Sequence, residues 1–241
     1  MASTLTVGTL AYGYQAIDAF GLLDVLSSGS DIFVNDLELF HAVNPIAKEK
    51  APKIVFHHVG LNREPIQALT TGLTLVPTCT VDDAPDFDIL LVPGPNPYGF
   101  ELDPRFKELI HRQVASGRLL FTNCTGACIA AQAGVLDGKK ATVNHAFLKW
   151  AAKEYPNVNW TAEAQWVVDG NVWTAAGAVA GMDMAAHWLK ENYGKEVMTL
   201  SAMNLDFEPR DVKGVLNVIP QRYDAEGKQT ASHVFDYTDS F

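Results

Sequence analysis

The chain lacks several features that define large classes of protein. Its 241 residues contain no apolar run approaching the length of a membrane-spanning helix, and the N-terminus has neither the basic nor the apolar region of a secretory signal. Positive charge is also scarce, because 18 Lys and Arg stand against 28 Asp and Glu, a net charge of −10, and the basic residues form no cluster. The sequence therefore argues against a nucleic-acid partner and against binding to an anionic membrane.

Cysteine is sparse as well. The three cysteines, Cys79, Cys124 and Cys128, are too few for the disulfide framework of a small secreted protein. Cys124 and Cys128 stand four residues apart, but no His or further Cys lies near them in the sequence to complete a zinc site. We therefore expect a protein of the cytoplasm or another reducing compartment, with no metal and no cofactor.

Apolar residues are plentiful, at 48% of the chain, and they occur in short runs that alternate with helical segments. Strands are expected at 5–10, 53–59, 73–76, 79–81, 88–92 and 119–121, followed by a hairpin over 166–174. Helices are expected at 17–26, 104–116, 146–154 and 178–193, with a further one directly after the 119–121 strand. Residues 36–43 are expected to form one or two helical turns, which Asn44-Pro45 ends. This order predicts an α/β fold with a mostly parallel sheet flanked by helices.

The chain shows no internal repeat and no interior linker of biased composition. Residues 1–204 are therefore expected to form one α/β domain. Residues 205–241 are more polar, and we expect this C-terminal extension to pack on the domain or on a dimer partner.

The most informative segment is 118–134, which contains a short apolar run, then Cys124, and then an Ala-rich helix. Gly126 follows the cysteine by two residues, as in a nucleophile elbow, where a sharp strand-to-helix turn presents one reactive side chain. The start of a helix favours negative charge, so the pattern predicts a Cys124 thiolate that attacks electrophiles. The alternative is that Cys124 is a small buried core residue, as free cysteines commonly are.

Two other segments are expected to end near Cys124. Ligands bind where the strands of an open α/β sheet end, and both the loop after the first strand and the Pro93-Gly94 turn occupy such ends. The first loop leads to Asp18 and contains Tyr12 and Tyr14, whose rings can line an apolar pocket. Asp18 also fits a simpler role, since an acidic residue in the first turn of a helix stabilises that helix.

Five motifs carry a resemblance to a known superfamily. In chain order they are Asp18-Ala-Phe-Gly, Leu90-Leu-Val-Pro-Gly, Asn123-Cys-Thr-Gly-Ala, Gly134-Val-Leu-Asp-Gly-Lys-Lys-Ala-Thr and Thr174-Ala-Ala-Gly-Ala-Val-Ala-Gly-Met-Asp. Their order and spacing resemble the ThiJ/PfpI superfamily of class I glutamine amidotransferase-like proteins over roughly residues 5–195. The resemblance implies a flavodoxin-like three-layer sandwich, Cys124 as the nucleophile, and a homodimer.

Within this superfamily the motifs are most similar to the isonitrile hydratase branch. Thr125 stands where peptidase-like members carry His, and Asp18 stands where many members carry Glu. The resemblance implies an enzyme that adds water to an isocyanide and forms an N-substituted formamide through a cysteine thioimidate. In that mechanism the Cys124 thiolate attacks the substrate, a protonated Asp18 donates a proton, and Thr125 holds the water.

Other residues are expected to bind the substrate or its developing charge. The backbone N–H groups of Gly94 and Thr125 can serve as donors, although Pro95 removes one donor that superfamily members often supply. Asn144 matches the position of a site-facing residue in related proteins better than its neighbour His145 does.

Several functions stay open at this stage. The Cys-Thr-Gly pattern is also similar to the sensor domain of AraC-type regulators, but the residues after Asn204 are too few and too acidic for their helix-turn-helix module. A glyoxalase III-like or deglycase-like enzyme acting on α-oxoaldehydes is a second possibility. A redox sensor whose Cys124 oxidises to a sulfinic acid is a third. The preferred prediction is a hydro-lyase acting on a small molecule.

Overall fold

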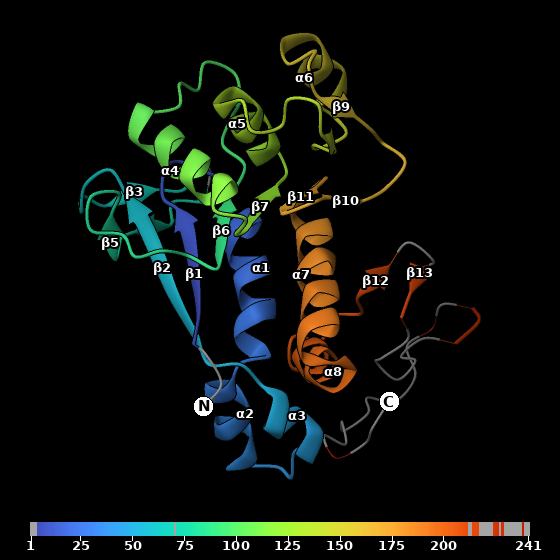
Figure 1. The fold of residues 1–241 in the computed structure, drawn as a ribbon. Helices are drawn as coiled ribbons and strands as arrows, with labels where there is room; N and C mark the ends of the chain where they lie inside the picture. Colours follow the sequence, from blue (N-terminus) through green and yellow to red (C-terminus); the bar gives the residue numbers. More distant parts are fainter. Residues whose placement is uncertain are drawn as a thin grey trace. The chain divides into compact units, whose positions relative to one another are not determined.

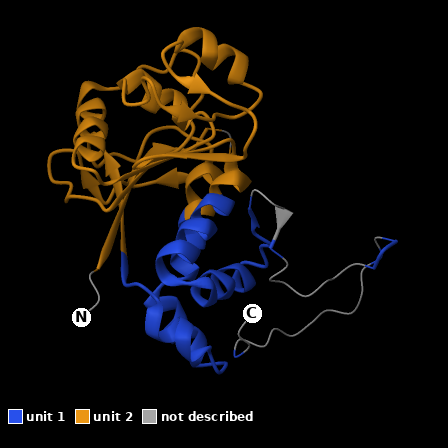
Figure 2. Ribbon diagram, turned by 45° about the vertical axis from the view of Figure 1, so that its right-hand side comes forward, with its two compact units in different colours: residues 1–3, 23–54, 182–241 blue, residues 4–22, 55–181 orange. Residues whose placement is uncertain are grey.

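The computed structural model describes residues 4–69, 71–211, 214–216, 224–226, 228 and 238. The chain divides into two compact units, coloured separately in Figure 2. Residues 4–22 and 55–181 form the first, called the sheet unit below, and residues 1–3, 23–54 and 182–241 form the second, called the helical unit. The sequence predicts no interior boundary, because each unit is assembled from separated segments and no linker marks the division.

The sheet unit contains a seven-stranded sheet with the order β10-β11-β7-β6-β1-β2-β5 (Figure 1). Its strands are β1 (Leu5–Leu10), β2 (Ile54–Gly60), β5 (Cys79–Thr80), β6 (Ile89–Val92), β7 (Leu119–Asn123), β10 (Trp166–Asp169) and β11 (Val172–Ala175). The pairs β1/β6, β6/β7, β7/β11 and β2/β5 are parallel, and β10/β11 is the predicted antiparallel hairpin. The predicted α/β fold with a mostly parallel central sheet is confirmed.

Three adjacent parallel strands, β1, β6 and β7, position the candidate site. Leu91 of β6 lies opposite both Thr9 of β1 and Phe121 of β7, so the three strands run in register. β6 is buried along its whole length, as expected for a continuous apolar strand covered on both faces. Because the strands are parallel and aligned, the loops that follow them leave the sheet at the same edge.

Helices cover both faces of this sheet (Figures 1 and 2). α4 (Pro104–Ala115) and α5 (Gly126–Ala133) lie on one face, and the first turns of α1 (Ala16–Ser28) and α7 (Ala178–Tyr193) lie on the other. This arrangement is the three-layer sandwich that the sequence predicts. The sheet unit also contains α6 (Leu148–Glu154) and two short strand pairs, β3 (Ile66–Gln67) with β4 (Thr74–Leu75) and β8 (Lys140–Ala141) with β9 (Asn159–Trp160).

Local signals set the ends of these helices. Asp103 caps α4 by accepting a hydrogen bond from the Arg105 N–H at 2.9 Å, and Pro104 occupies the first helical position. α5 ends at Gly134, whose φ of 89° lies in the left-handed region that glycine adopts without strain. Such signals lie within a few residues of the feature they determine, so they can be read from the sequence.

The helical unit contains two helices that the sequence analysis did not predict. Its elements are the later turns of α1 and α7, together with α2 (Asp31–Glu38), α3 (Pro45–Lys50), α8 (Lys195–Asn204), β12 (Arg210–Asp211) and β13 (Gly214–Val215). Asn44-Pro45 was expected to end a helix, but it begins α3, because the Asn44 side chain accepts from the Ile46 N–H at 2.9 Å and Pro45 starts the helix. Likewise, Gly194 ends α7 with a φ of 97° and also opens α8.

The start of the C-terminal extension is held by an ion pair whose acidic member is buried. Asp183 of α7 is fully buried, and its carboxylate accepts from the Arg210 backbone N–H at 2.9 Å and from the Arg210 guanidinium at 3.0 and 2.6 Å. Burial raises the pKa of Asp183, and the bonds from Arg210 oppose that rise. The proposed domain boundary at residue 204 stays a prediction, since most of 205–241 lies outside the described residues.

Replacing Arg210 with Met is expected to lower the free energy of unfolding by about 1–3 kcal/mol, because the buried Asp183 carboxylate loses its charged partner. Chemical denaturation measures this change. Lys48→Met is the matched control in the same unit, since Lys48 pairs with Glu38 where both side chains are at least 40% exposed. That change should alter stability by about 0.5 kcal/mol or less. Equal effects of the two substitutions would contradict this role of Arg210 as the partner of Asp183.

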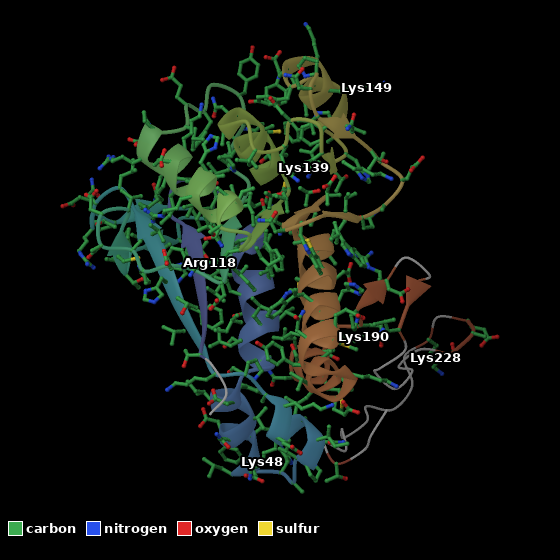
Figure 3. The ribbon with its side chains drawn as sticks, viewed as in Figure 1. Lys48, Arg118, Lys139, Lys149, Lys190 and Lys228 are labelled. Carbon is green, nitrogen blue, oxygen red and sulfur yellow. The ribbon has the colours of Figure 1, made fainter. Side chains whose placement is uncertain are left out.

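Within the described ranges, no helix combines the length and apolar character needed to cross a bilayer. In the sheet unit, the labelled Arg118, Lys139 and Lys149 lie apart from one another (Figure 3).

Candidate active site

Cys124 occupies the sharp turn between β7 and α5. Its φ of 58° is unusual for a residue with a side chain, and its backbone N–H donates to the Ala175 carbonyl at 3.0 Å. Gly126 passes so close to the Val92 carbonyl that any Cβ there would overlap it. The strained cysteine and the obligatory glycine together form the elbow geometry that the sequence predicts.

The Cys124 sulfur lies in a largely enclosed position, with 7% of the residue exposed. The Asn144 side-chain amide donates to it at 3.2 Å. The orientation of that amide is fixed, because its oxygen accepts from the Ala146 N–H at 3.0 Å. His145 is exposed. The structure therefore brings Asn144, and not His145, to the sulfur.

Asp18 reaches the same place from the first turn of α1 and is 1% exposed. A Cβ placed on Gly94 would lie 2.6 Å from an Asp18 carboxyl oxygen and 2.7 Å from the Thr125 hydroxyl, so the three residues meet. Among the described residues, neither Asp18 oxygen completes a hydrogen bond of ordinary geometry. Even so, the Cys124 thiol and the Gly94 N–H both approach closely enough to lower the pKa of Asp18.

The electrostatics of the pair set where its proton resides. Burial raises the pKa of Asp18 to about 6, against the opposing effects of the Cys124 thiol and the Gly94 N–H. Burial and the Asp18 charge raise the pKa of Cys124 to about 11, although Asn144 and the Thr125 N–H act in the other direction. Between these values the pair holds one proton, on the sulfur, because both groups cannot be charged in this enclosed site.

This resting state differs from the expectation of a Cys124 thiolate beside a protonated Asp18. The helix start does favour the thiolate, but desolvation and the neighbouring carboxylate outweigh it. At neutral pH the geometry instead places a thiol next to a carboxylate that can accept its proton.

The donors expected to bind negative charge are partly engaged elsewhere. The Gly94 N–H is directed at Asp18, and the Gly94 carbonyl accepts from the Gln15 N–H at 3.1 Å. The buried Thr125 hydroxyl donates to the Pro95 carbonyl at 2.5 Å, so only its lone pairs can meet a water molecule. The donors directed at the sulfur are the Thr125 N–H and the Asn144 amide.

The two predicted tyrosines are both buried beside this site. The Tyr12 hydroxyl donates to the Pro93 carbonyl at 2.7 Å, and its ring packs against Phe100 with the centroids 5.0 Å apart. Tyr14 is 2% exposed, and its hydroxyl finds no partner in the described part of the chain. Burial raises the pKa of Tyr14 to about 12, so the group stays a neutral donor. Tyr12 thus fixes the Pro93 turn, while Tyr14 retains an unused hydroxyl.

Asn123 is a buried polar residue to which the sequence analysis assigned no role. Its side-chain amide donates to the backbone carbonyl of Asp18 at 2.9 Å. The only signal in the sequence was its position directly before Cys124, since its partner lies 105 residues away.

Among the described residues, no group of three or more His, Cys, Asp or Glu is arranged to hold a metal ion. Cys128 is fully buried in α5, and burial raises the pKa of its thiol to about 12. Two hollows of about 280 Å³ lie along α4 and share Leu109 and Arg112, but no residue of the Cys124 site lines them.

Replacing Gly94 with Ala is expected to reduce turnover about 10- to 100-fold, because the new methyl group displaces Asp18 or Thr125 from the site. Steady-state kinetics with the proposed substrate class measures the change. Gly13→Ala is the matched control, since a Cβ there meets its nearest atoms at 3.6 and 3.7 Å, an ordinary contact distance. Full activity in Gly94→Ala would mean that the close approach of Gly94 to Asp18 has no part in the chemistry.

Comparison with known proteins bears on this arrangement. The sequence model of the DJ-1/PfpI family matches residues 10–191. The isonitrile hydratase of Pseudomonas putida is 32% identical over 161 residues, 66% of this chain and 68% of that protein. The HTH-type transcriptional regulator GbdR of Pseudomonas aeruginosa is 25% identical over 185 residues, 77% of this chain and 47% of the regulator. The chain thus spans about half the length of the regulator.

Solved structures show the same fold. A ThiJ/PfpI family protein from Pseudomonas syringae superposes with a TM-score of 0.69 at 21% identity, covering 87% of this chain and 78% of that one. DJ-1beta of Drosophila melanogaster gives 0.65 at 20% identity, covering 86% and 99%. An AraC family transcriptional regulator from Pseudomonas putida gives 0.66 at 20% identity, covering 84% and 100%. At these identities the similarity establishes the fold and not the activity.

Proposed function

The chain belongs to the DJ-1/PfpI family, and from that premise we propose that it is a cysteine-dependent hydro-lyase of the isonitrile hydratase type. Such an enzyme adds water to an isocyanide and releases an N-substituted formamide. The observation that carries the proposal is a carboxyl group, in place of a histidine, against a buried thiol at the end of β7. The 32% identity to an isonitrile hydratase supports the same reaction class.

The first step forms two bonds to one atom. The terminal carbon of an isocyanide accepts a nucleophile and a proton together, so the site needs a thiol and a base that returns the proton. The Asp18 carboxylate takes the Cys124 proton as the sulfur attacks this carbon. Asp18 then delivers the proton to the same carbon, and the product is a thioimidate with an S–C bond, a C–H bond and a C=N bond.

The second step consumes water and regenerates the pair. The Asp18 carboxylate removes a proton from a water molecule whose oxygen attacks the thioimidate carbon, and it then delivers this proton to the nitrogen. The C–S bond then breaks, the carbonyl forms, and the hydroxyl proton passes to the departing sulfur. The products are the formamide and the Cys124 thiol. The Asn144 amide and the Thr125 N–H stabilise negative charge on sulfur in both steps.

The enclosed site suits an uncharged substrate. Cys124, Asp18, Tyr12 and Tyr14 are all at most 9% exposed, so a charged group would lose its hydration there. The Tyr14 hydroxyl, which has no partner among the described residues, offers one donor to the substrate nitrogen or to the attacking water. As the family resemblance implies, we also propose a homodimer, and sedimentation of the purified protein tests it. The scarcity of cysteine supports a cytoplasmic location as a further part of the proposal.

A second candidate function follows from the regulator relatives. The similarity to GbdR extends over 77% of this chain, and it supports the alternative of a regulator-type domain that binds a small molecule without converting it. In that case the same site would take up a ligand, and Cys124 would add to it slowly or only be oxidised.

One set of assays separates these functions. The purified protein is incubated with an alkyl isocyanide, with methylglyoxal and with dilute peroxide, and the products and the mass of the Cys124 peptide are determined. Catalytic release of formamide supports the proposal. Consumption of methylglyoxal alone indicates a glyoxalase III-like or deglycase-like enzyme. Sulfinic acid on Cys124 with no turnover of either substrate indicates a sensor and contradicts the proposal.

A further inference from the structure

We propose that Asn123 is a positioning residue that holds Asp18 at a fixed spacing from Cys124. Its importance for turnover rests on the function proposed above, but its effect on the spacing of the two groups does not.

The contact joins the two halves of the site directly. Asn123 is the last residue of β7 and the immediate neighbour of Cys124, and it is fully buried. Its amide donates to the carbonyl of Asp18 itself, at 2.9 Å. One side chain thus connects the strand end that carries the sulfur to the helical turn that carries the carboxyl group.

A glycine holds the amide in place from the other side. A Cβ on Gly181, in the first turn of α7, would overlap the Asn123 side chain and lie 2.6 Å from its Cγ. The amide therefore fills the space between the backbone of Gly181 and the carbonyl of Asp18. Only glycine leaves this space open, so the first turn of α7 takes part in positioning Asp18.

The polar character of Asn123 is costly where it stands. Its side-chain oxygen is buried and has no partner within the described residues. An unpaired buried oxygen destabilises the fold, and an apolar residue of similar size would avoid this cost. Such an apolar residue could not donate the hydrogen bond that the Asn123 amide gives to the Asp18 carbonyl.

Strand alternation separates this contact from general packing. Thr122 precedes Asn123 on β7 and is equally buried, but its side chain points to the opposite face of the sheet. Its hydroxyl also has no partner among the described residues. Thr122 therefore shares the burial and the strand of Asn123 without touching Asp18.

The spacing of the pair can be measured without substrate, from the pH dependence of alkylation of Cys124 by iodoacetamide. Burial raises the thiol pKa most, and Asp18 is the charged neighbour that adds to this rise. Cys128, Tyr12 and Tyr14 have pKa values raised well above neutrality by burial, so they stay uncharged near neutral pH. If Asp18 moves away, the pH midpoint for alkylation of Cys124 falls. A fall of one pKa unit makes alkylation about tenfold faster at a fixed pH below the midpoint.

The experiment compares Asn123→Ala and Gly181→Ala with two controls by peptide mass spectrometry and steady-state kinetics. Thr122→Ala truncates a buried polar residue of the same strand, and Gly177→Ala adds a methyl group near the start of α7 where no atom lies within 4 Å. We expect the alkylation midpoint to fall in Asn123→Ala and Gly181→Ala toward that of Asp18→Asn, with kcat/KM reduced about 10- to 100-fold. Both controls should keep the midpoint of the unmodified protein.

Wild-type midpoints in Asn123→Ala and Gly181→Ala would overturn the inference, even if both variants unfold more easily, because lost packing alone changes stability and not the titration. A shifted midpoint in Thr122→Ala would overturn it too. If the unmodified protein fails to convert an isocyanide, the proposed function fails, while the alkylation midpoints still decide the role of Asn123.

Discussion

Replacing Cys124 with Ala is expected to reduce formamide production by about 10⁴-fold or more, because the thiol beside Asp18 that forms the thioimidate is lost. The fold should persist, since the change removes one sulfur atom from a residue that is already small. We expect a stability change of about 1 kcal/mol. Product quantification with an alkyl isocyanide and a thermal unfolding curve measure the two effects.

Cys128→Ala is the matched control for this prediction. Cys128 is also buried and lies four residues further along in α5, and the titratable group that acts on its pKa is Cys124 and not Asp18. Its loss should leave formamide production within a few-fold of the unmodified protein. Residual turnover in Cys124→Ala at more than a few per cent of that level would contradict the assignment of the nucleophile.

Asp18→Asn is expected to lower kcat/KM about 10²- to 10⁴-fold, because the amide cannot take the proton from Cys124 or from water. The unmodified protein should lose activity as the pH falls through about 6, where Asp18 becomes protonated. Activity should also decline as the pH rises toward about 11, where the thiol loses its proton. Steady-state kinetics across this range measures both limbs.

The same substitution should stabilise the protein near neutral pH. The pKa of Asp18 rises from 3.8 to about 6 on folding, so burial of its charge disfavours the folded state once the carboxyl group ionises. This penalty is absent below the unfolded value of 3.8 and complete above about 6, and it amounts to about 3 kcal/mol at most. Asp18→Asn should therefore gain about 1–3 kcal/mol near pH 7 and little below pH 4.

The stability measurement separates two roles for Asp18. If Asp18 only stabilises the start of α1, neutralising it should lower the free energy of unfolding by about 0.3–1 kcal/mol. A destabilised Asp18→Asn variant at neutral pH with normal turnover would support that simpler role and contradict the role of Asp18 as the base that serves Cys124.

Much of the fold follows from signals that are local in the sequence. The first strand is predicted with the bounds of β1, and Asp103-Pro104 and Gly134 mark helix ends because each acts within one turn. α3 and α8 were missed for a related reason. Asn44-Pro45 is compatible with the end of one helix and with the start of another. Packing against the rest of the fold decides between the two, and here the pair begins α3.

The candidate site also has features that the sequence predicts and features that depend on the complete fold. The meeting of Cys124, Asp18 and Gly94 could be predicted because parallel strands place their ends at one edge of a sheet. The protonation of the pair could not, since it depends on how completely the fold buries Asp18 and on the direction of the Gly94 N–H. Asn123 escaped prediction because both of its contacts, with Asp18 and Gly181, join segments far apart in the chain.

The titration of Cys124 in the unmodified protein and in Asp18→Asn tests the central claim most directly. If the thiol and the carboxyl group share one proton, the thiol midpoint lies near 11 in the unmodified protein. It should fall by about one pKa unit or more when the Asp18 charge is removed. Identical midpoints in the two proteins would show that the two groups do not interact, and the proposed hydration chemistry would then lack its base.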